Sequence, residues 1–148
     1  MRIRIISVGR DKEFTAAAAE EYAARLRRFV DLDLVELSAA SGPSAKEREA
    51  ERILARRLPR GELWVLDQRG SELTSIEVSR RIARLRDSAL DLSLCIGGDE
   101  GLAPAVVQAA AFSWSLSRLT LPHRLARVVS LEQLYRAFEI LRGGPYHK

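Results

Sequence analysis

The chain has 148 residues, of which 47% are hydrophobic and 30% are charged, a balance typical of a folded globular protein and not of a disordered one. This length fits one domain, so residues 1–148 are expected to fold as a single unit. A net charge of +4 favours an anionic partner only weakly. No apolar run is long enough to span a bilayer, and the single cysteine, Cys95, excludes an intrachain disulfide. We therefore expect a cytoplasmic protein with no membrane partner.

The hydrophobic pattern switches repeatedly between period two, typical of strands, and a period near 3.6, typical of helices. Alternation predicts strands at residues 2–8, 31–37, 62–67, 91–96 and 115–121. The helical pattern predicts helices at residues 13–29, 44–58, 74–86, 104–111 and 124–142. Two helices begin with the sequence of a capping box, Ser44 with Glu47 and Thr74 with Glu77. In the first helix the expected buried stripe consists of Phe14, Ala18, Tyr22, Leu26 and Phe29.

Strands that alternate with helices at this spacing indicate an α/β fold with a mainly parallel sheet and helices on both faces. In such sheets ligands bind beyond the carboxyl ends of the strands. That rule points to three segments as a candidate binding site: the residues after Leu66, residues 97–101 and residues 116–123.

The turn Ile-Gly-Gly-Asp-Glu-Gly, residues 96–101, follows a predicted buried strand. Adjacent glycines let the backbone approach a ligand with no Cβ in the way, although taken alone such a turn is more often a simple strand-to-helix connection. It is neither the Rossmann dinucleotide fingerprint nor a Walker A loop. It also differs from the GGDEF signature of diguanylate cyclases, because Gly101 stands in place of the phenylalanine.

Two further segments contain residues that could bind a ligand or take part in a reaction. Residues 115–123, Ser-Leu-Ser-Arg-Leu-Thr-Leu-Pro-His, are by themselves typical of a half-buried strand ended by a proline. The C-terminal end holds Tyr146, His147 and Lys148, a combination suited to stacking on and hydrogen-bonding an unpaired base. An ordinary amphipathic helix with a solvated end is the alternative. Cys95 and the two tryptophans, Trp64 and Trp114, are expected in the core.

Four blocks in this order and spacing resemble the RlmH family of SPOUT-class RNA methyltransferases: IGGDEGL (96–102), SLSRLTLPH (115–123), EQLYRA (132–137) and PYHK (145–148). The resemblance covers nearly the whole chain, is strong from residue 62 onward, and includes SVGR (7–10) near the N-terminus. The chain departs from the family pattern at Asp99, where a smaller residue or a proline is common. Because the backbone of the turn would hold the ligand, this departure concerns only the loop geometry.

The resemblance implies a C-terminal trefoil knot, a homodimer and methylation of N3 of a pseudouridine in large-subunit (23S) ribosomal RNA. The methyl donor it implies is S-adenosylmethionine, with no metal. By matching positions, the donor is expected to contact Leu66, Gly97, Leu116, Ser117, Arg118, Leu119, Thr120 and Leu121. Periodicity by itself indicates a plain doubly wound sheet, since knotted connections are rare.

Methylation of N3 requires loss of its proton, which a general base or a nearby cation would assist. The groups available are His147, His123, Glu100 and Arg136. The resemblance favours Tyr146 and His147, with Arg136 close by, reaching towards the cofactor of the partner subunit. His123 is expected to be structural, packing its turn onto the last helix.

A chain of this size has few ways to grip a folded RNA, so the assembled ribosome or large subunit is the expected substrate. A non-catalytic ribosome-binding factor is the alternative from another functional class. A nucleotide-dependent oxidoreductase is disfavoured because the dinucleotide fingerprint is missing.

Overall fold

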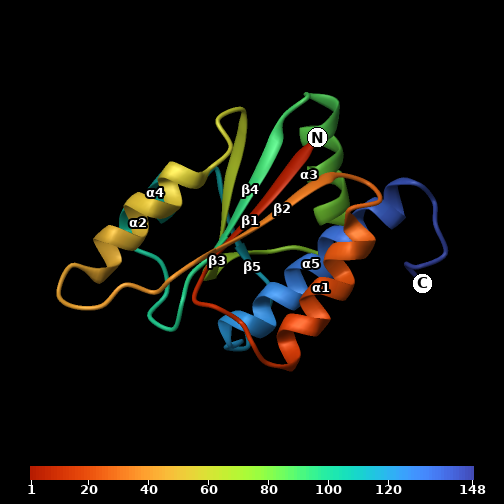
Figure 1. Ribbon diagram of the computed structural model, residues 1–148. Coiled ribbons are helices and arrows are strands. Elements are labelled where there is room, and N and C mark those ends of the chain that lie inside the picture. Colours follow the sequence, from red (N-terminus) through yellow and green to blue (C-terminus); the bar gives the residue numbers. More distant parts are fainter.

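Strands and helices alternate along the whole chain in the computed structural model, which describes residues 1–148 (Figure 1). The strands are β1 (Arg2–Val8), β2 (Asp31–Leu37), β3 (Gly61–Glu72), β4 (Asp91–Ile96) and β5 (Phe112–Ser115). The helices are α1 (Phe14–Leu26), α2 (Ala45–Arg56), α3 (Ser75–Asp87), α4 (Pro104–Ala109) and α5 (His123–Leu141).

The five strands form one sheet in the order β2-β1-β4-β3-β5, and every neighbouring pair is parallel. The predicted parallel α/β architecture is thus confirmed. Because all strands run in the same direction, their carboxyl ends meet at one edge of the sheet. The connection that follows β1 leads to β2 on one side of the sheet, whereas the connection that follows β4 leads to β5 on the other side. Ligands of open α/β sheets bind beyond the carboxyl ends of the strands at such a switch point.

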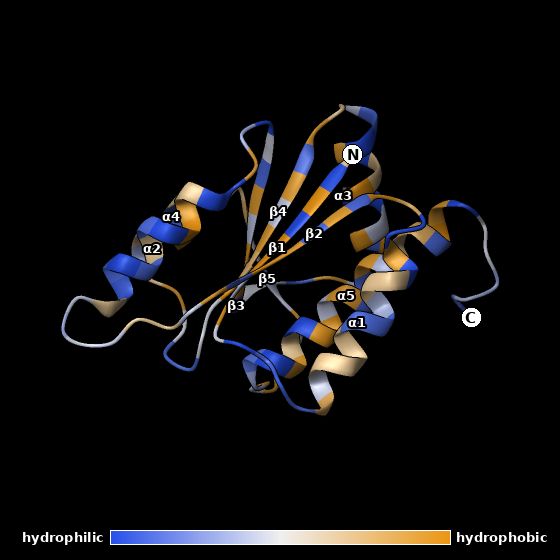
Figure 2. Cartoon of the chain, in the orientation of Figure 1, coloured by the Kyte–Doolittle hydropathy of each residue, from blue (hydrophilic) through white to orange (hydrophobic).

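Helices cover both faces of the sheet, as predicted. α1, α3 and α5 lie on one face, and α2 and α4 on the other (Figure 1). Each face of the sheet has its own hydrophobic core, and β1 contributes to both. Ile3 and Ile5 pack on the side of α1, α3 and α5, while Ile6 and Val8 pack on the side of α2 and α4. α2 is mostly hydrophilic (Figure 2), since it buries only the side chains of its inner stripe, Ala50 and Ile53.

One of the two predicted capping boxes forms. The Oγ1 atom of Thr74 accepts a hydrogen bond from the backbone amide of Glu77 at 3.2 Å, and the Glu77 carboxylate accepts one from the Thr74 amide at 2.7 Å. The box predicted at Ser44 is wrong, because Ser44 makes no side-chain cap bond. Its backbone, with φ −106° and ψ 25°, does not adopt the extended conformation that an N-cap needs.

The predicted buried stripe of α1 is confirmed at Leu26, but the other buried positions are displaced around the helix. Phe14 is 80% exposed, and the buried positions are Thr15, Ala19, Ala23 and Leu26. Alanines fill the inner stripe because α1 packs directly against α5, and small side chains allow two helices to approach closely. Tyr22 and Phe29 of the predicted stripe are only partly buried, packed against the same core.

The edge of the sheet also differs from the prediction. β3 continues to Glu72, past an irregularity between Leu66 and Ser71, and pairs there with β5. β5 consists of Phe112–Ser115, so the strand predicted at residues 115–121 is wrong except for its first residue. The aromatic-rich segment before Ser115 suits a strand, and it buries Trp114 to 2% exposure between β3 and the helices.

Candidate functional site

A cleft of about 680 Å³ lies at the carboxyl-terminal edge of the sheet. The irregular part of β3 that begins at Leu66, the turn after β4 and the loop after β5 form most of its wall. These are the three segments that the carboxyl-edge rule predicts. Its lining residues are Lys46, Leu66–Arg69, Ile96–Leu102, Trp114–Ser117, Leu119–His123 and Ala126. A cleft of this volume is in the range of small-molecule and cofactor sites.

Gly97, at the start of the glycine turn after β4, lies too close to the opposite side of the turn to carry a side chain. A Cβ atom at Gly97 would lie 2.8 Å from the carbonyl carbon of Gly101 and 3.1 Å from Cγ of Leu102. Gly101 has a φ of +74°, a conformation that favours glycine. Its amide donates a hydrogen bond to the Gly98 carbonyl at 3.0 Å, which closes the turn. The backbone of this turn therefore forms a wall of the cleft directly.

Residues 116–121 form a loop and not the predicted strand. The hydroxyl of Ser115 donates to the carbonyl of Ser117 at 3.1 Å, and the hydroxyl of Ser117 accepts from the amide of Leu119 at 3.0 Å. Such local side-chain bonds compete with strand pairing, which explains why β5 ends here. Five of the six residues expected to bind the donor from this loop line the cleft, whereas Arg118 does not.

Asp67 brings a carboxylate to the same cleft, just beyond Leu66. Its side chain is only 16% exposed and accepts hydrogen bonds from the backbone amide of Arg69 at 2.9 Å and from its guanidinium at 3.1 and 3.2 Å. These bonds hold the pKa of Asp67 below its ordinary value. The carboxylate therefore stays ionised and available to hydroxyl or amine donors of a ligand. The sequence analysis did not name Asp67 as a site residue, although it directly follows Leu66, in a segment that the carboxyl-edge rule marks.

His123 begins α5 and lines the cleft as well. Its Nδ1 atom lies 2.9 Å from a carboxylate oxygen of Asp99. The pair connects the glycine turn to the start of α5 across the cleft, which agrees with a structural role for His123. No signal in the sequence pairs these two residues, because they are 24 positions apart and join only when β4 and β5 lie in the same sheet.

The C-terminal tail folds back onto α5. The Tyr146 hydroxyl donates to a carboxylate oxygen of Glu132 at 3.0 Å, and Arg136 donates to the same oxygen at 2.6 and 2.9 Å. The Arg136 guanidinium lies 3.5 Å from Nδ1 of His147 and 4.6 Å from the centre of the Tyr146 ring. The structure thus brings Arg136, Tyr146 and His147 together, and adds Glu132, whose i, i+4 spacing from Arg136 is the signal that could have identified it.

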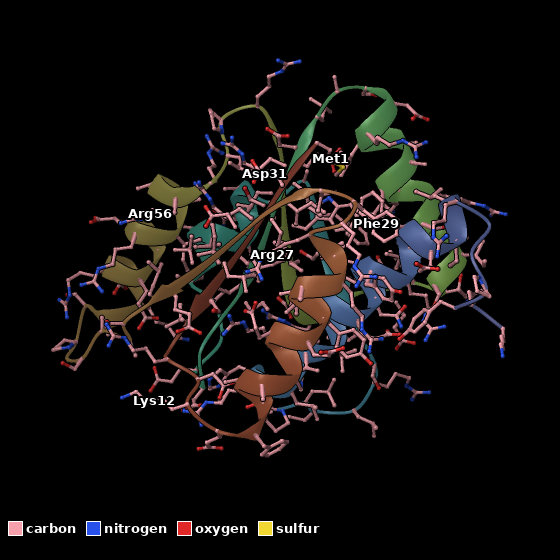
Figure 3. The ribbon with its side chains drawn as sticks, turned by 45° about the vertical axis from the view of Figure 1, so that its right-hand side comes forward. Met1, Lys12, Arg27, Phe29, Asp31 and Arg56 are labelled. Atoms are coloured by element: carbon pink, nitrogen blue, oxygen red, sulfur yellow. The ribbon has the colours of Figure 1, made fainter.

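Glu132 fixes the protonation of its two partners. Hydrogen bonds to Glu132 raise the pKa of Arg136, so the guanidinium stays charged. Burial, together with hydrogen bonds to Tyr22 and Glu132, raises the pKa of Tyr146, so the phenol stays a hydrogen-bond donor. Beside this cluster, Phe29 (Figure 3) stacks against Phe138 of α5, with ring centres 5.5 Å apart.

The tail cluster and the cleft lie at opposite ends of α5. His123 and Ala126 line the cleft, whereas none of Arg136, Tyr146 and His147 does. Arg136 lies thirteen residues after His123, so the helix separates them by roughly 20 Å at 1.5 Å per residue. Within one chain, the tail cluster therefore does not reach the cleft.

Other reactive and aromatic residues belong to the core, as predicted. Trp64 and Trp114 are 1% and 2% exposed and pack edge to face. Cys95 is fully buried, and burial raises its pKa to about 12. The chain holds no group of three or more His, Cys, Asp or Glu side chains placed to bind a metal ion, and none of its helices has the length and hydropathy of a membrane span.

A family profile described as "Predicted SPOUT methyltransferase" matches residues 1–147. The chain belongs to the SPOUT methyltransferase family. This SPOUT methyltransferase is 48% identical over 153 residues to the ribosomal RNA large subunit methyltransferase H of Anaeromyxobacter sp. (strain Fw109-5), with all of both proteins covered. It is 42% identical over 156 residues to the protein of the same name from Hydrogenovibrio crunogenus (strain DSM 25203 / XCL-2), covering 100% of this chain and 99% of that one.

Solved structures share the fold of this SPOUT methyltransferase. A probable methylase family protein from Haemophilus influenzae Rd KW20 superposes with a TM-score of 0.57 at 13% identity, covering 99% of this chain and 70% of that one. The resemblance drawn from the sequence blocks is confirmed by the relatives at 48% and 42% identity. Use of S-adenosylmethionine follows in general from membership of the family.

Proposed function

We propose that this chain transfers a methyl group from S-adenosylmethionine to N3 of a pseudouridine in large-subunit (23S) ribosomal RNA. The observation that carries the proposal is the cleft built from the glycine turn and the loop at residues 116–121, in a member of the SPOUT methyltransferases. The names of its relatives, which are ribosomal RNA large subunit methyltransferases, supply the substrate class. Action on ribosomes would place the protein in the cytoplasm.

The residues of the cleft fit a donor of this size and polarity. Gly97 and Gly101 present bare backbone, since a Cβ atom at Gly97 would meet the opposite strand of the turn. Leu66 and the loop residues that line the cleft, Leu116, Ser117 and Leu119–Leu121, offer apolar contact together with amide and carbonyl groups. The ionised carboxylate of Asp67 suits ribose hydroxyls or an amino group. When bound, S-adenosylmethionine supplies an electrophilic methyl group.

We infer that the tail of one subunit completes the cleft of a second copy. The distance along α5 keeps Arg136, Tyr146 and His147 from the cleft of their own chain, so a partner chain is needed to bring them there. Two apolar side chains, Phe14 near the start of α1 at 80% exposure and Leu125 near the start of α5 at 38%, are left at the surface and available to such a homodimer interface. The trefoil knot implied by the family resemblance stays a prediction.

The chain's own residues then have two tasks. The first is to hold the base at the mouth of the cleft, which as pure positioning is worth roughly 7–11 kcal/mol of the barrier. The second is to remove the N3 proton or stabilise the anion left behind, which a general base accelerates by about 10²–10⁴-fold. The His147 imidazole is the candidate general base, and the permanently charged Arg136 beside it would stabilise the anion. Tyr146, whose hydroxyl donates to Glu132, would offer its ring for stacking on the base.

Radiolabelled S-adenosylmethionine tests the function directly. The protein is incubated separately with naked rRNA, large subunits and whole ribosomes, and label is expected in 23S rRNA of the ribosome or large subunit. Transfer to none of the three would refute the proposed activity. His147→Ala should lose most of the transfer while still binding S-adenosylmethionine in a calorimetric titration, and full retained activity would refute the role given to His147.

A further inference from the structure

Four cations at the carboxyl-terminal edge of the sheet form no ion pair within the chain. Arg10 and Lys12 come from the loop after β1, Lys46 from the first turn of α2, and Arg118 from the loop after β5. None of them takes part in any of the eleven salt bridges of the structure. Arg10, Lys12 and Arg118 are exposed, and Lys46 is partly buried where it lines the cleft.

The acids at the same edge are mostly occupied by partners inside the chain. These pairs are Glu13 with Arg124 at 2.6 Å, Asp67 with Arg69 at 3.1 Å, and Asp99 with His123 at 2.9 Å. Glu100 in the glycine turn takes part in no ion pair, and neither does Asp11, which accepts a hydrogen bond from the amide of Glu13 at 3.1 Å. The internal pairing therefore leaves the four cations free to meet an external anion.

The position of Lys46 is not explained by helix stability. It lies in the first turn of α2, where the helix dipole favours acidic side chains and disfavours cations. Arg118 also has no partner that explains its position. Its neighbours Ser117 and Leu119 line the cleft, whereas Arg118 is exposed and does not line it. Together with Lys12, which projects from the end of the molecule opposite Met1 (Figure 3), these side chains lie around the carboxyl-terminal edge into which the cleft opens.

An RNA strand that presents one base to the cleft must lay the phosphates on either side of that base along this edge. Phosphate contacts by Lys and Arg fix the position and register of a nucleic acid, whereas base contacts specify it. We propose that Arg10, Lys12, Lys46 and Arg118 bind the backbone phosphates that flank the acceptor nucleotide. This phosphate-binding edge rests on the proposed function and adds to it the path of the RNA strand.

The salt dependence of ribosome binding tests the proposal. The triple variant Arg10→Gln, Lys12→Gln, Lys46→Gln removes three charges from the carboxyl-terminal edge. The matched control, Arg57→Gln, Arg60→Gln, Arg84→Gln, removes three equally unpaired charges near the amino-terminal edge, where Arg84 lines a small cavity with Glu62 and Leu90. A second control, Arg10→Lys, Lys12→Arg, Lys46→Arg, changes the same three side chains but keeps their charges. It keeps the proposal testable if the first variant misfolds.

The affinity of each protein for ribosomes that lack the methyl group is measured from 50 to about 200 mM KCl, the range over which counterion release is large. Each lost phosphate contact should reduce the slope of log affinity against log salt by about 0.7–0.9, so about 2–3 for the triple variant. The control and the charge-preserving variant should keep the wild-type slope to within about one such unit.

Equal slopes for the triple variant and the control, in a wild type that methylates ribosomes, would overturn the phosphate-binding edge and leave the proposed function standing. A parallel fall in S-adenosylmethionine affinity, measured by calorimetry, would also overturn it, because the cations would then serve the donor and not the RNA. A wild type that neither binds S-adenosylmethionine nor methylates any ribosomal substrate would instead refute the proposed function itself.

Discussion

Replacing Gly97 by alanine puts a methyl group into the tightest part of the glycine turn. The new Cβ atom would lie 2.8 Å from the carbonyl carbon of Gly101, whereas carbon atoms pack favourably at about 3.5–4.0 Å. The nearest atoms belong to backbone, so no side-chain rotation relieves the overlap and the turn itself must move by about 0.7 Å or more. Overpacking of this kind costs about 1–3 kcal/mol of folding free energy.

The shifted turn should also weaken donor binding, because the backbone of residues 97–101 forms a wall of the cleft. A loss of about 1.4 kcal/mol in binding free energy is a tenfold loss of affinity, and we expect a loss of at least this size for S-adenosylmethionine. The assays are urea unfolding for the folding free energy and isothermal titration calorimetry for the donor. In a chain of this length each kcal/mol corresponds to about 2–4 °C in Tm.

Gly98→Ala is the matched control within the same turn. A Cβ atom there would lie 3.4 Å from Cγ1 of Val8, at the close end of ordinary contact, and Gly98 has no positive φ. We expect a change in folding free energy within about 0.5 kcal/mol, as for substitutions away from strained features, and donor affinity close to that of the wild type. Wild-type stability and donor affinity for Gly97→Ala, or equal losses for both variants, would refute the assignment of the turn to the donor site.

Three further predictions follow from single contacts. Glu132→Gln leaves Arg136 and Tyr146 without their shared carboxylate. Methyl transfer should fall at least about tenfold, as expected for loss of a positioning contact, while the donor affinity measured by calorimetry stays unchanged. Unchanged transfer would contradict this positioning role. Asp67→Asn removes a carboxylate whose pKa the hydrogen bonds from Arg69 depress. Its contribution to stability is present above the unfolded pKa of about 3.9 and disappears as the pH falls through the folded value, so urea unfolding should show the variant to be less stable at neutral pH and equal to the wild type in acid; a pH-independent difference would argue against it. Cys95, whose pKa burial raises to about 12, should react with a thiol reagent only as fast as the chain unfolds, and rapid labelling of the native protein would show that the thiol is accessible.

The prediction of the fold succeeded where local pattern is decisive. Buried strands such as Asp91–Ile96, in which five successive residues are buried, are recognisable because both faces are covered. The prediction failed at the sheet edge, where β5 depends on pairing with a part of β3 that follows an irregularity. It failed again in α1, whose inner stripe depends on how closely α5 approaches.

Some features of the candidate site could likewise be predicted from local sequence, and others could not. Local sequence determined that a glycine turn follows a buried strand and that a cationic, aromatic tail follows a long helix, because glycine geometry and helix period act over a few residues. Only the tertiary structure decided that Asp99 meets His123 and that the tail cluster lies a helix length from the cleft of its own chain. Those relations join residues from separate elements, and they exist only once five strands have taken their order in the sheet.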